Sequence, residues 1–291
     1  MNTIIQQCLA VIMVMLTSFT MPAKTENVKI QGDHCRLDAI LQMPERKPAD
    51  VMPVAILMHG LTGNKDGMFL RAIADSLERR GVASIRFDFN GHGHSEGSFT
   101  DMTIPNEVTD ARMVYNWLME QHRFGDVYLF GHSQGSVVAA LLATELGPQK
   151  VKRLVLASTA SNIPEMCRKG KLFGYKFDPK NPPASMLFWE NKKLGGNYIR
   201  EAQKIDVYET VKTYTGPVLL LHGGADTGVP PSCSEKLKVS LPQAEMIITP
   251  GANHVFTKHT KNLVNPTVDF FTRKMPEKKQ VDSSVSGSQY K

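Results

Sequence analysis

Short apolar runs alternate with amphipathic stretches through the middle of the chain. The apolar runs cover residues 54–58, 83–89, 127–130, 154–157, 218–221 and 246–248. Most are apolar at every position, which is typical of parallel strands covered on both faces. The stretches with apolar residues at helical spacing cover residues 69–80, 107–121, 136–146, 235–239 and 260–273. This alternation predicts an α/β fold with a doubly wound, mostly parallel sheet, in which ligands bind at the carboxyl ends of the strands.

One connection between two predicted strands is far longer than the usual ~2–6 residues. About sixty residues separate the strand that ends near Ser158 from the one that begins at Val218. We interpret residues 161–213, approximately, as a cap inserted over the strand ends of a single domain that covers residues 24–275. Between residues 165 and 201 the chain carries eight Lys and Arg against four Asp and Glu, so the predicted cap is basic.

The overall composition is that of an ordinary globular protein. Of the 291 residues, 42% are hydrophobic and 21% are charged, and the mean hydropathy is −0.22. These values exclude a disordered chain, a collagen-like chain and a multi-span membrane protein. The formal net charge of +6 is too small to indicate a nucleic-acid partner. The oligomeric state does not follow from the sequence.

Both ends of the chain differ from the middle. Residues 8–19 form a short apolar run whose length matches a secretory signal rather than the ~20 residues of a membrane span. We therefore expect a signal peptide over residues 1–23 and a secreted or periplasmic protein; a buried N-terminal helix or strand is the alternative, since residues 1–7 lack Lys and Arg. Residues 276–291 are rich in Ser and Lys and are expected to form a disordered tail. Cleavage would leave Cys35, Cys167 and Cys233, which can form at most one disulfide.

Two segments match the G-x-S-x-G pattern of a nucleophile elbow, which places a serine on a tight turn between a strand and a helix. Residues 131–135 (GHSQG) follow an apolar run and precede a helical stretch, as an elbow requires. Residues 93–97 (GHSEG) are followed by GSFTDMTIP, without a helical pattern until residue 107. Ser133 is therefore the candidate nucleophile, and Ser95 is interpreted as a loop residue.

A serine hydroxyl is a good nucleophile only when a neighbouring base takes its proton. In enzymes with this elbow the chain order is Ser, then Asp or Glu, then His. Asp226 and His254 each follow a predicted strand after Ser133, so all three side chains are expected at one edge of the sheet. His254 would accept the proton of Ser133, and Asp226 would orient the imidazole and stabilise its charged form.

Negative charge that develops on a carbonyl oxygen needs preorganised N–H donors. One donor is usually the backbone N–H of the residue after the nucleophile, which is Gln134 here. The other comes from the loop after an early strand. That loop is HGLTG at residues 59–63, and the backbone N–H of Leu61 is the candidate.

The remaining histidines receive structural interpretations. Three of them stand beside glycines at strand ends, where we expect them to brace loops: His59, His132 and His222. A second group could be imagined as a metal site: Asp88, His92 and His94. These residues lie in a glycine-rich turn without a further cluster of ligands, so we expect no metal. Side chains and backbone complete the proposed chemistry, and no cofactor is expected.

Five segments together resemble the α/β-hydrolase superfamily: HGLTGNK, RFDFNGHGHSEGSFTDMT, GHSQGSVVA, HGGADTGVP and GANHVF. Over residues 28–271 the chain is most similar to bacterial cinnamoyl (feruloyl) esterases and the related serine aminopeptidase and monoglyceride-lipase-like group. The resemblance implies the same triad and oxyanion donors, and a cap that covers an aromatic acyl group. By the similarity of LGGNYIR to the family's cap, Tyr198 maps to a contact with the phenolic hydroxyl. The first half of the cap departs from the family pattern, and Ser136 stands where members often have glycine.

The combined expectation is a serine carboxylic-ester hydrolase that works through an acyl-enzyme on hydroxycinnamoyl (feruloyl) or similar esters, including saccharide-linked ones. An aminopeptidase-type peptidase or a monoacylglycerol-type lipase would use the same triad. The peptidase would need cap carboxylates to bind a free α-amino group. Those available are Glu165, Asp178, Glu190 and Glu201, amid excess positive charge. A non-catalytic binding protein is the remaining alternative, and the intact triad argues against it.

Overall fold

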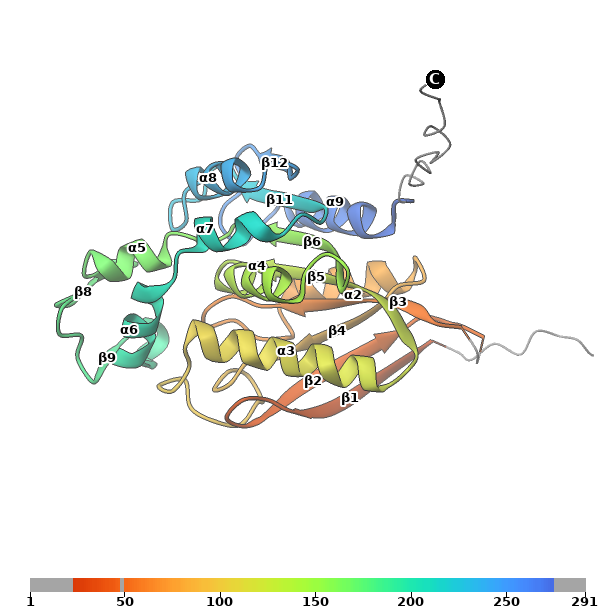
Figure 1. Ribbon diagram of the computed structural model, residues 1–291, viewed down its shortest axis with the longest axis horizontal. Helices are drawn as coiled ribbons and strands as arrows, with labels where there is room; N and C mark the ends of the chain where they lie inside the picture. The colour runs from red at the N-terminus through yellow and green to blue at the C-terminus, as the bar shows by residue number, and fades with distance from the viewer. Residues whose placement is uncertain (1–22, 48–49, 275–291) are drawn as a thin grey trace, which may run out of the picture.

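One eight-stranded sheet forms the centre of the computed structural model, which describes residues 23–47 and 50–274. The strand order is β1-β2-β4-β3-β5-β6-β11-β12 (Figure 1). The strands are β1 (Lys24–Gln31), β2 (Arg36–Met43), β3 (Met52–Met58), β4 (Ala83–Phe87), β5 (Phe124–His132), β6 (Val151–Ala157), β11 (Val218–Gly223) and β12 (Glu245–Thr249). Residues 1–22 of the expected signal peptide and the whole expected tail lie outside the described residues.

Six of these strands are parallel to one another. From β4 through β3, β5, β6 and β11 to β12, each strand pairs in parallel with its neighbour. These six strands are the ones that the apolar runs predict, so the expected α/β class with a mostly parallel sheet is confirmed. The carboxyl ends of the six strands consequently meet at one edge of the sheet.

An antiparallel hairpin, β1–β2, extends the sheet beyond β4 and is not among the predicted strands. It pairs with β4 through β2, also antiparallel. Over residues 36–41 of β2, only alternate side chains are fully buried: Leu37, Ala39 and Leu41. This half-buried alternation is typical of antiparallel strands, whereas the prediction relied on runs that are apolar throughout.

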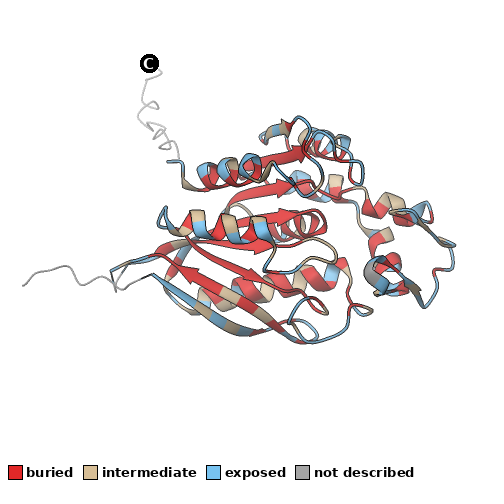
Figure 2. Cartoon of the chain, turned by 180° about the vertical axis from the view of Figure 1, so that it is seen from behind, coloured by how far each residue is buried: buried red, intermediate tan, exposed pale blue. Residues whose placement is uncertain are grey.

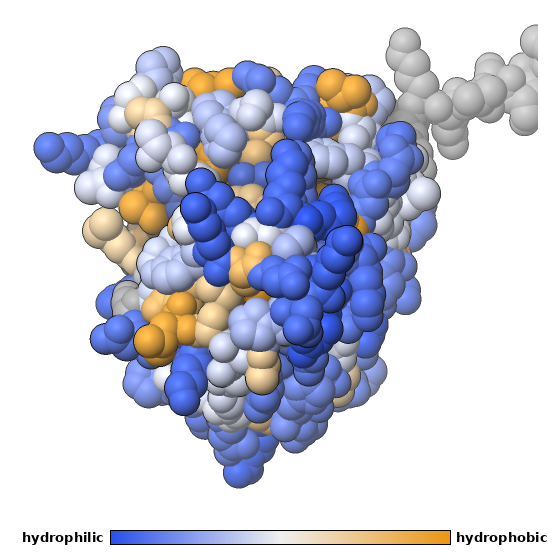
Figure 3. All heavy atoms as spheres, turned by 90° about the vertical axis from the view of Figure 1, so that its left-hand side faces the viewer, coloured by the Kyte–Doolittle hydropathy of each residue, from blue (hydrophilic) through white to orange (hydrophobic). Residues whose placement is uncertain are grey.

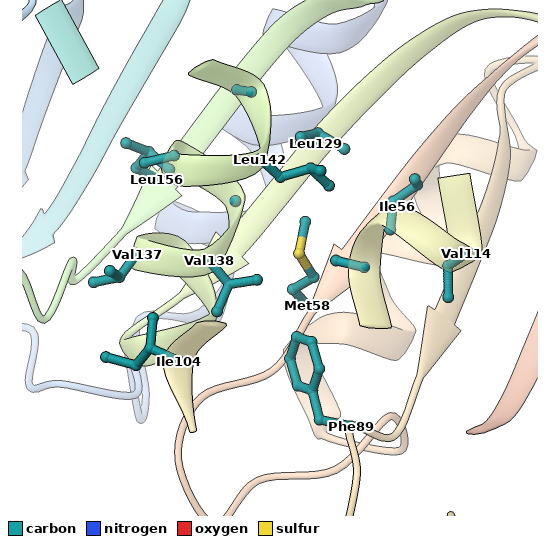
Figure 4. Close-up of a cluster of buried hydrophobic side chains, with 14 of the residues drawn as sticks. Ile56, Met58, Phe89, Ile104, Val114, Leu129, Val137, Val138, Leu142 and Leu156 are labelled. Atoms are coloured by element: carbon teal, nitrogen blue, oxygen red, sulfur yellow. The ribbon is translucent and has the colours of Figure 1, made fainter. Parts of the chain in front are cut away.

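Helices cover both faces of the sheet. α3 (Ile104–Glu120), α4 (Gln134–Leu146) and α8 (Ser232–Ser240) pack on one face, and α2 (Met68–Glu78) and α9 (Thr260–Thr272) on the other. Successive strand residues point to opposite faces: in β3, Ile56 and Met58 join the core under α3 and α4 (Figure 4), and Ala55 and Leu57 join the core under α2 and α9. The central strands are buried along nearly their whole length (Figure 2).

Most of the long connection between β6 and β11 gathers at one end of the molecule, and its last part returns alongside α4 (Figure 1). Its elements are α5 (Ile163–Arg168), β7 (Lys171–Leu172), β8 (Tyr175–Lys176), β9 (Ser185–Leu187), η1 (Trp189–Asn191), β10 (Lys193–Gly195), α6 (Gly196–Lys204), α7 (Val207–Thr210) and η2 (Val211–Thr213). Its four short strands form two separate antiparallel pairs. From this end the surface is mostly hydrophilic, with separate hydrophobic patches (Figure 3). We call the segment 161–213 the cap segment.

Two further observations concern membrane-spanning helices and the cysteines. None of the helices in the described ranges is long and apolar enough to cross a membrane. Cys35, Cys167 and Cys233 are buried free thiols.

Candidate active site

Ser133 lies on a tight turn between β5 and α4. Its φ of 56° is in the left-handed region, which is unfavourable for residues other than glycine and is typical of a nucleophile elbow. Close packing requires the two flanking glycines. A Cβ on Gly131 would lie 2.2 Å from the carbonyl oxygen of Gly135, and a Cβ on Gly135 would lie 2.1 Å from that of His59. The structure thus gives Ser133 the strand-turn-helix setting that the sequence predicts.

The other G-x-S-x-G segment forms no elbow. Ser95 lies in a loop, where its hydroxyl donates to the carbonyl oxygen of Asp88 at 2.6 Å and accepts from the backbone N–H of Asp38 at 2.8 Å. These bonds join the end of β4 to β2. Ser95 therefore holds a turn in place, as its sequence context indicates.

Asp226 and His254 lie in the loops after β11 and β12, beside Ser133. The Nε2 atom of His254 is 2.9 Å from the Oγ atom of Ser133, and its Nδ1 atom is 2.6 Å from Oδ2 of Asp226. These three residues stand far apart in the chain, yet the strand ends bring them into one hydrogen-bonded series. In this geometry an imidazole can accept the serine proton while a carboxylate orients it.

The environment of Asp226 favours its charged form. Burial raises the pKa of this carboxyl, but hydrogen bonds from His222 and His254 outweigh burial and hold the pKa well below its usual range. Its Oδ1 atom also accepts the backbone N–H groups of Gly228 at 3.0 Å and Val229 at 2.9 Å. Because Asp226 is ionised, it accepts the Nδ1–H of His254 and leaves Nε2 free to take the proton of Ser133.

The two predicted oxyanion donors flank the nucleophile. Gly60 packs so closely that a Cβ there would lie 2.8 Å from the Cβ of Ser133, and Leu61 is the next residue of that loop. Gln134 follows Ser133 as the first residue of α4. Within 23–47 and 50–274, neither backbone N–H has a protein acceptor. Both are therefore available to a negatively charged oxygen beside Ser133.

A cavity of about 970 Å³ opens over Ser133 and His254. Its floor is formed by the loop of residues 59–64, and part of its wall comes from the cap segment. The wall includes two aromatic side chains, Phe173 and Trp189, whose ring centroids lie 5.0 Å apart. It also includes Lys169 and Lys171, and no Asp or Glu belongs to the lining that the structure describes. The cap segment thus gives the cavity both aromatic side chains and positive charge.

Comparison with known proteins identifies the family. Residues 53–168 match the family model for the alpha/beta hydrolase fold. The structure of Est1E from Butyrivibrio proteoclasticus with ferulic acid bound is 35% identical in sequence, has a TM-score of 0.79, and aligns over 84% of this chain and 97% of Est1E. The chain belongs to the α/β-hydrolase family.

Curated relatives of this hydrolase include a lipase. Lysophosphatidylserine lipase ABHD12 of Danio rerio is 29% identical over 195 residues, which make up 64% of this chain and 46% of that protein. The chain spans about half the length of the curated relatives it matches. A structure of XC6422 from Xanthomonas campestris, described as a serine hydrolase without a lid, shares the fold at 20% identity and a TM-score of 0.58. The lipase relative and the two solved structures agree with the hydrolase fold of this chain.

The other histidines of the hydrolase hold the loops around the triad. The Nδ1 atom of His59 lies 2.8 Å from the carbonyl oxygen of Gly60, and burial lowers the pKa of His59 to about 4. The Nε2 atom of His132 lies 2.8 Å from the carbonyl oxygen of His254, and burial lowers the pKa of His132 to about 3. Both rings are therefore neutral and donate one N–H each. His222 is bonded in the same way, with Nε2 at 2.9 Å from the carbonyl oxygen of Val229.

Two of the three residues considered as a metal site, Asp88 and His94, lie around a lysine. The Nζ atom of Lys65 lies 2.8 Å from Asp88, 2.7 Å from Asp38 and 3.2 Å from Nδ1 of His94. Burial lowers the pKa of Lys65, but its bonds to the two carboxylates outweigh burial and raise it. The ammonium group therefore supplies the positive charge of this cluster. His92 lies apart from it, with Nδ1 at 2.9 Å from the carbonyl oxygen of Asn90.

Tyr198 does not lie at the cavity. Its side chain, on α6, is fully buried, and its hydroxyl donates to Oε1 of Gln134 at 2.6 Å. The cavity lining does not include it. The contact with a substrate hydroxyl that the resemblance implies therefore has no counterpart in this arrangement, because the tyrosine O–H already has an internal acceptor.

Sequence reasoning missed the cap residues that do line the cavity, Lys169, Lys171, Phe173 and Trp189. Their only signal was membership of the long basic insertion. Which of its aromatic and basic residues turn inward depends on the two short hairpins, whose two- and three-residue strands leave no periodic pattern.

Proposed function

We propose that this α/β-hydrolase is a serine carboxylic-ester hydrolase that works through an acyl-enzyme. The hydrogen-bonded series of Ser133, His254 and Asp226 carries this proposal. The Oγ atom of Ser133 attacks the ester carbonyl carbon while Nε2 of His254 takes the serine proton. The carbonyl oxygen becomes negatively charged and accepts hydrogen bonds from the N–H groups of Leu61 and Gln134.

The second half of the reaction uses the same groups. The carbon–oxygen bond to the alcohol breaks, and the alcohol leaves with the proton held by His254. Water then donates a proton to His254 and attacks the acyl-serine carbonyl. Return of that proton to Ser133 releases the carboxylic acid and restores the enzyme.

The proposed substrates are esters of hydroxycinnamic acids such as ferulic acid. Est1E, which matches this chain over 97% of its length, was solved with ferulic acid bound. The cavity of about 970 Å³ has room for an aromatic acyl group, and Phe173 and Trp189 offer aromatic faces to it. Pairing of aromatic rings adds ~0.5–1.5 kcal/mol beyond the area that they bury.

The charge of the cavity bears on the alternatives. An aminopeptidase would bind a positively charged α-amino group, which lysines at positions 169 and 171 would repel. A lipase remains the second candidate, because ABHD12 is a relative and three of the exposed large hydrophobic side chains lie in the cavity lining or between residues of it. These are Met68, Trp189 and Val255.

A substrate panel tests the proposal. We expect hydrolysis of p-nitrophenyl acetate and methyl ferulate, and we expect Ser133→Ala to reduce both rates by at least ~10³-fold because it removes the nucleophile. The panel adds a long-chain monoacylglycerol, lysophosphatidylserine and an aminoacyl-p-nitroanilide. Activity that survives Ser133→Ala would exclude the serine mechanism. A higher kcat/KM for either lipid than for methyl ferulate would exclude hydroxycinnamoyl esters as the preferred class.

A further inference from the structure

We infer that Tyr198 of the cap segment is a positioning residue, which sets the oxyanion donor Gln134 through the hydrogen bond to its side chain. This inference rests on the proposed function, because it assigns a purpose to the backbone N–H of Gln134. It gives Tyr198 a task other than contact with substrate.

Both ends of the Gln134 side-chain amide are held. Its Oε1 atom accepts the hydroxyl of Tyr198 at 2.6 Å, and its Nε2 atom donates to Oε2 of Glu107 at 2.8 Å. All three side chains are buried, with exposures of 0% for Gln134 and Tyr198 and 1% for Glu107. A series of buried, hydrogen-bonded side chains is rigid, because a polar group that loses its partner there has no water to replace it.

The side chain of Gln134 can control its own backbone because of where it stands. Gln134 is the first residue of α4, directly after the strained turn at Ser133. First-turn N–H groups of a helix have no acceptor within the helix, so the direction of this N–H is set by the peptide plane between residues 133 and 134. The bonds that the carbonyl oxygen of Ser133 accepts from Ser136 hold that plane on the side of residue 133, and the side chain of Gln134 holds it on the side of residue 134. A side chain tied on both sides restricts rotation about the bonds of residue 134 and so restricts its N–H.

The bond also joins two parts of the molecule. Tyr198 belongs to α6 in the cap segment, Gln134 to α4 and Glu107 to the first turn of α3. α6 packs against α3, as the adjacent ribbons show (Figure 1). The cap segment therefore reaches the oxyanion donor through one hydroxyl, and displacement of α6 would loosen the N–H on which the reaction depends.

The test is Tyr198→Phe, which keeps the ring and deletes the hydroxyl. We expect kcat for methyl ferulate to fall about tenfold, less than the ~10²–10³ that loss of a whole oxyanion donor brings. KM should change less than twofold, because the contacts that bind the substrate before reaction stay in place.

Tyr214→Phe is the matched control. Tyr214 is also buried, at 1% exposure, and its hydroxyl donates to the carbonyl oxygen of Val151 at 2.9 Å. Val151 begins β6, at the end of the sheet opposite Ser133. Both variants lose one buried hydrogen bond, so both should lower the melting temperature by similar amounts. Only Tyr198→Phe should lower kcat; equal effects of the two variants on kcat, or none, would overturn the inference.

A double-mutant cycle separates positioning from general loosening. Gln134→Met keeps the backbone N–H but removes both side-chain bonds, so Tyr198→Phe should have almost no further effect on kcat in that background. Additive losses would mean that Tyr198 acts by another route. The proposed function fails separately, if the unmodified enzyme shows no esterase activity that depends on Ser133.

Discussion

Ser133 keeps its left-handed φ because neighbouring groups hold the turn from several sides. Its N–H donates to the carbonyl oxygen of Ala157 at 2.9 Å, and its own carbonyl oxygen accepts the hydroxyl of Ser136 at 2.6 Å. The side chain of Ser136 thus adds a bond to the turn. Backbone strain of order ~1–3 kcal/mol persists only where the surroundings fix the conformation. The close packing of Gly60 against Ser133 is part of those surroundings.

The close approach of Gly60 predicts a large effect from one methyl group. In Gly60→Ala the new Cβ would lie 2.8 Å from the Cβ of Ser133, so either the loop or the serine must move. We expect kcat/KM to fall by at least ~10²-fold, because displacement of the loop also displaces the oxyanion donor Leu61. Steady-state kinetics on p-nitrophenyl acetate would measure the loss.

Gly67→Ala serves as the control for that substitution. Gly67 also lines the cavity, but a Cβ there would meet its nearest neighbour at 3.4 Å, and its φ is −49°. The kcat/KM of the Gly67→Ala variant should stay within about threefold of the wild-type value. Equal losses in the two variants would show that crowding at Ser133 is not the cause.

Among the elements, those with a continuous local pattern are the ones that sequence predicts. β5 and α4 are apolar almost throughout and meet at a G-x-S-x-G turn, so the elbow follows from residues 127–146 alone. The sequence predicts the positions of Asp226 and His254 because each residue follows a predicted strand that is apolar throughout. The strands β1 and β2 are not apolar at every position, so this criterion does not find them. The partners of Tyr198 and Lys65 could not be predicted, because those contacts join segments whose relative positions only the tertiary fold sets.

Glu107 on α3 should make stability depend on pH. Burial raises the pKa of Glu107 from 4.5 to about 8, with a further rise from the charge of Asp110, and the bond from Gln134 only partly opposes this. The folded protein therefore keeps a proton that the unfolded chain releases. The stabilisation is complete below pH 4.5 and is lost as the pH rises through 8, at up to ~1.4 kcal/mol per pH unit.

Glu107→Gln should remove that dependence. Its melting temperature should rise relative to wild type between pH 5 and pH 8, because the amide never ionises. Differential scanning calorimetry at several pH values would measure the difference. Glu120→Gln, at the exposed end of the same helix, is the control. Parallel curves for wild type and Glu107→Gln would contradict the expectation.

For the molecule as a whole, the cap segment adds positive charge to an otherwise largely apolar cavity. Lys169 is paired with Glu165 at 2.5 Å. Lys171 lies directly opposite Lys176 across the β7–β8 pair. Like charges in this position repel each other, so an anion bound near Lys171 would relieve that repulsion. Substrates that place a negative group near Lys171 should therefore be favoured.

That preference can be measured with two ferulate esters, one neutral and one whose alcohol carries a carboxylate. Lys171→Glu should lower kcat/KM for the anionic ester about three- to tenfold relative to the neutral one, and added salt should reduce the difference. Lys180→Glu changes an exposed lysine of the cap segment outside the cavity lining and should leave the ratio close to that of wild type. An unchanged ratio in Lys171→Glu would show that the lysine is only solvated surface.

Three consecutive residues after Gly131 make separate connections. His132 is bonded to the loop of His254, Ser133 to the ring of His254, and Gln134 to the cap segment. Among the residues that the structure describes, only the last of these side chains has a hydrogen bond into the segment 161–213. A chimera in which another esterase supplies that segment would thus keep the Ser–His–Asp series intact. Its kcat would depend on whether the new segment places a hydroxyl within hydrogen-bonding distance of the side-chain amide of Gln134.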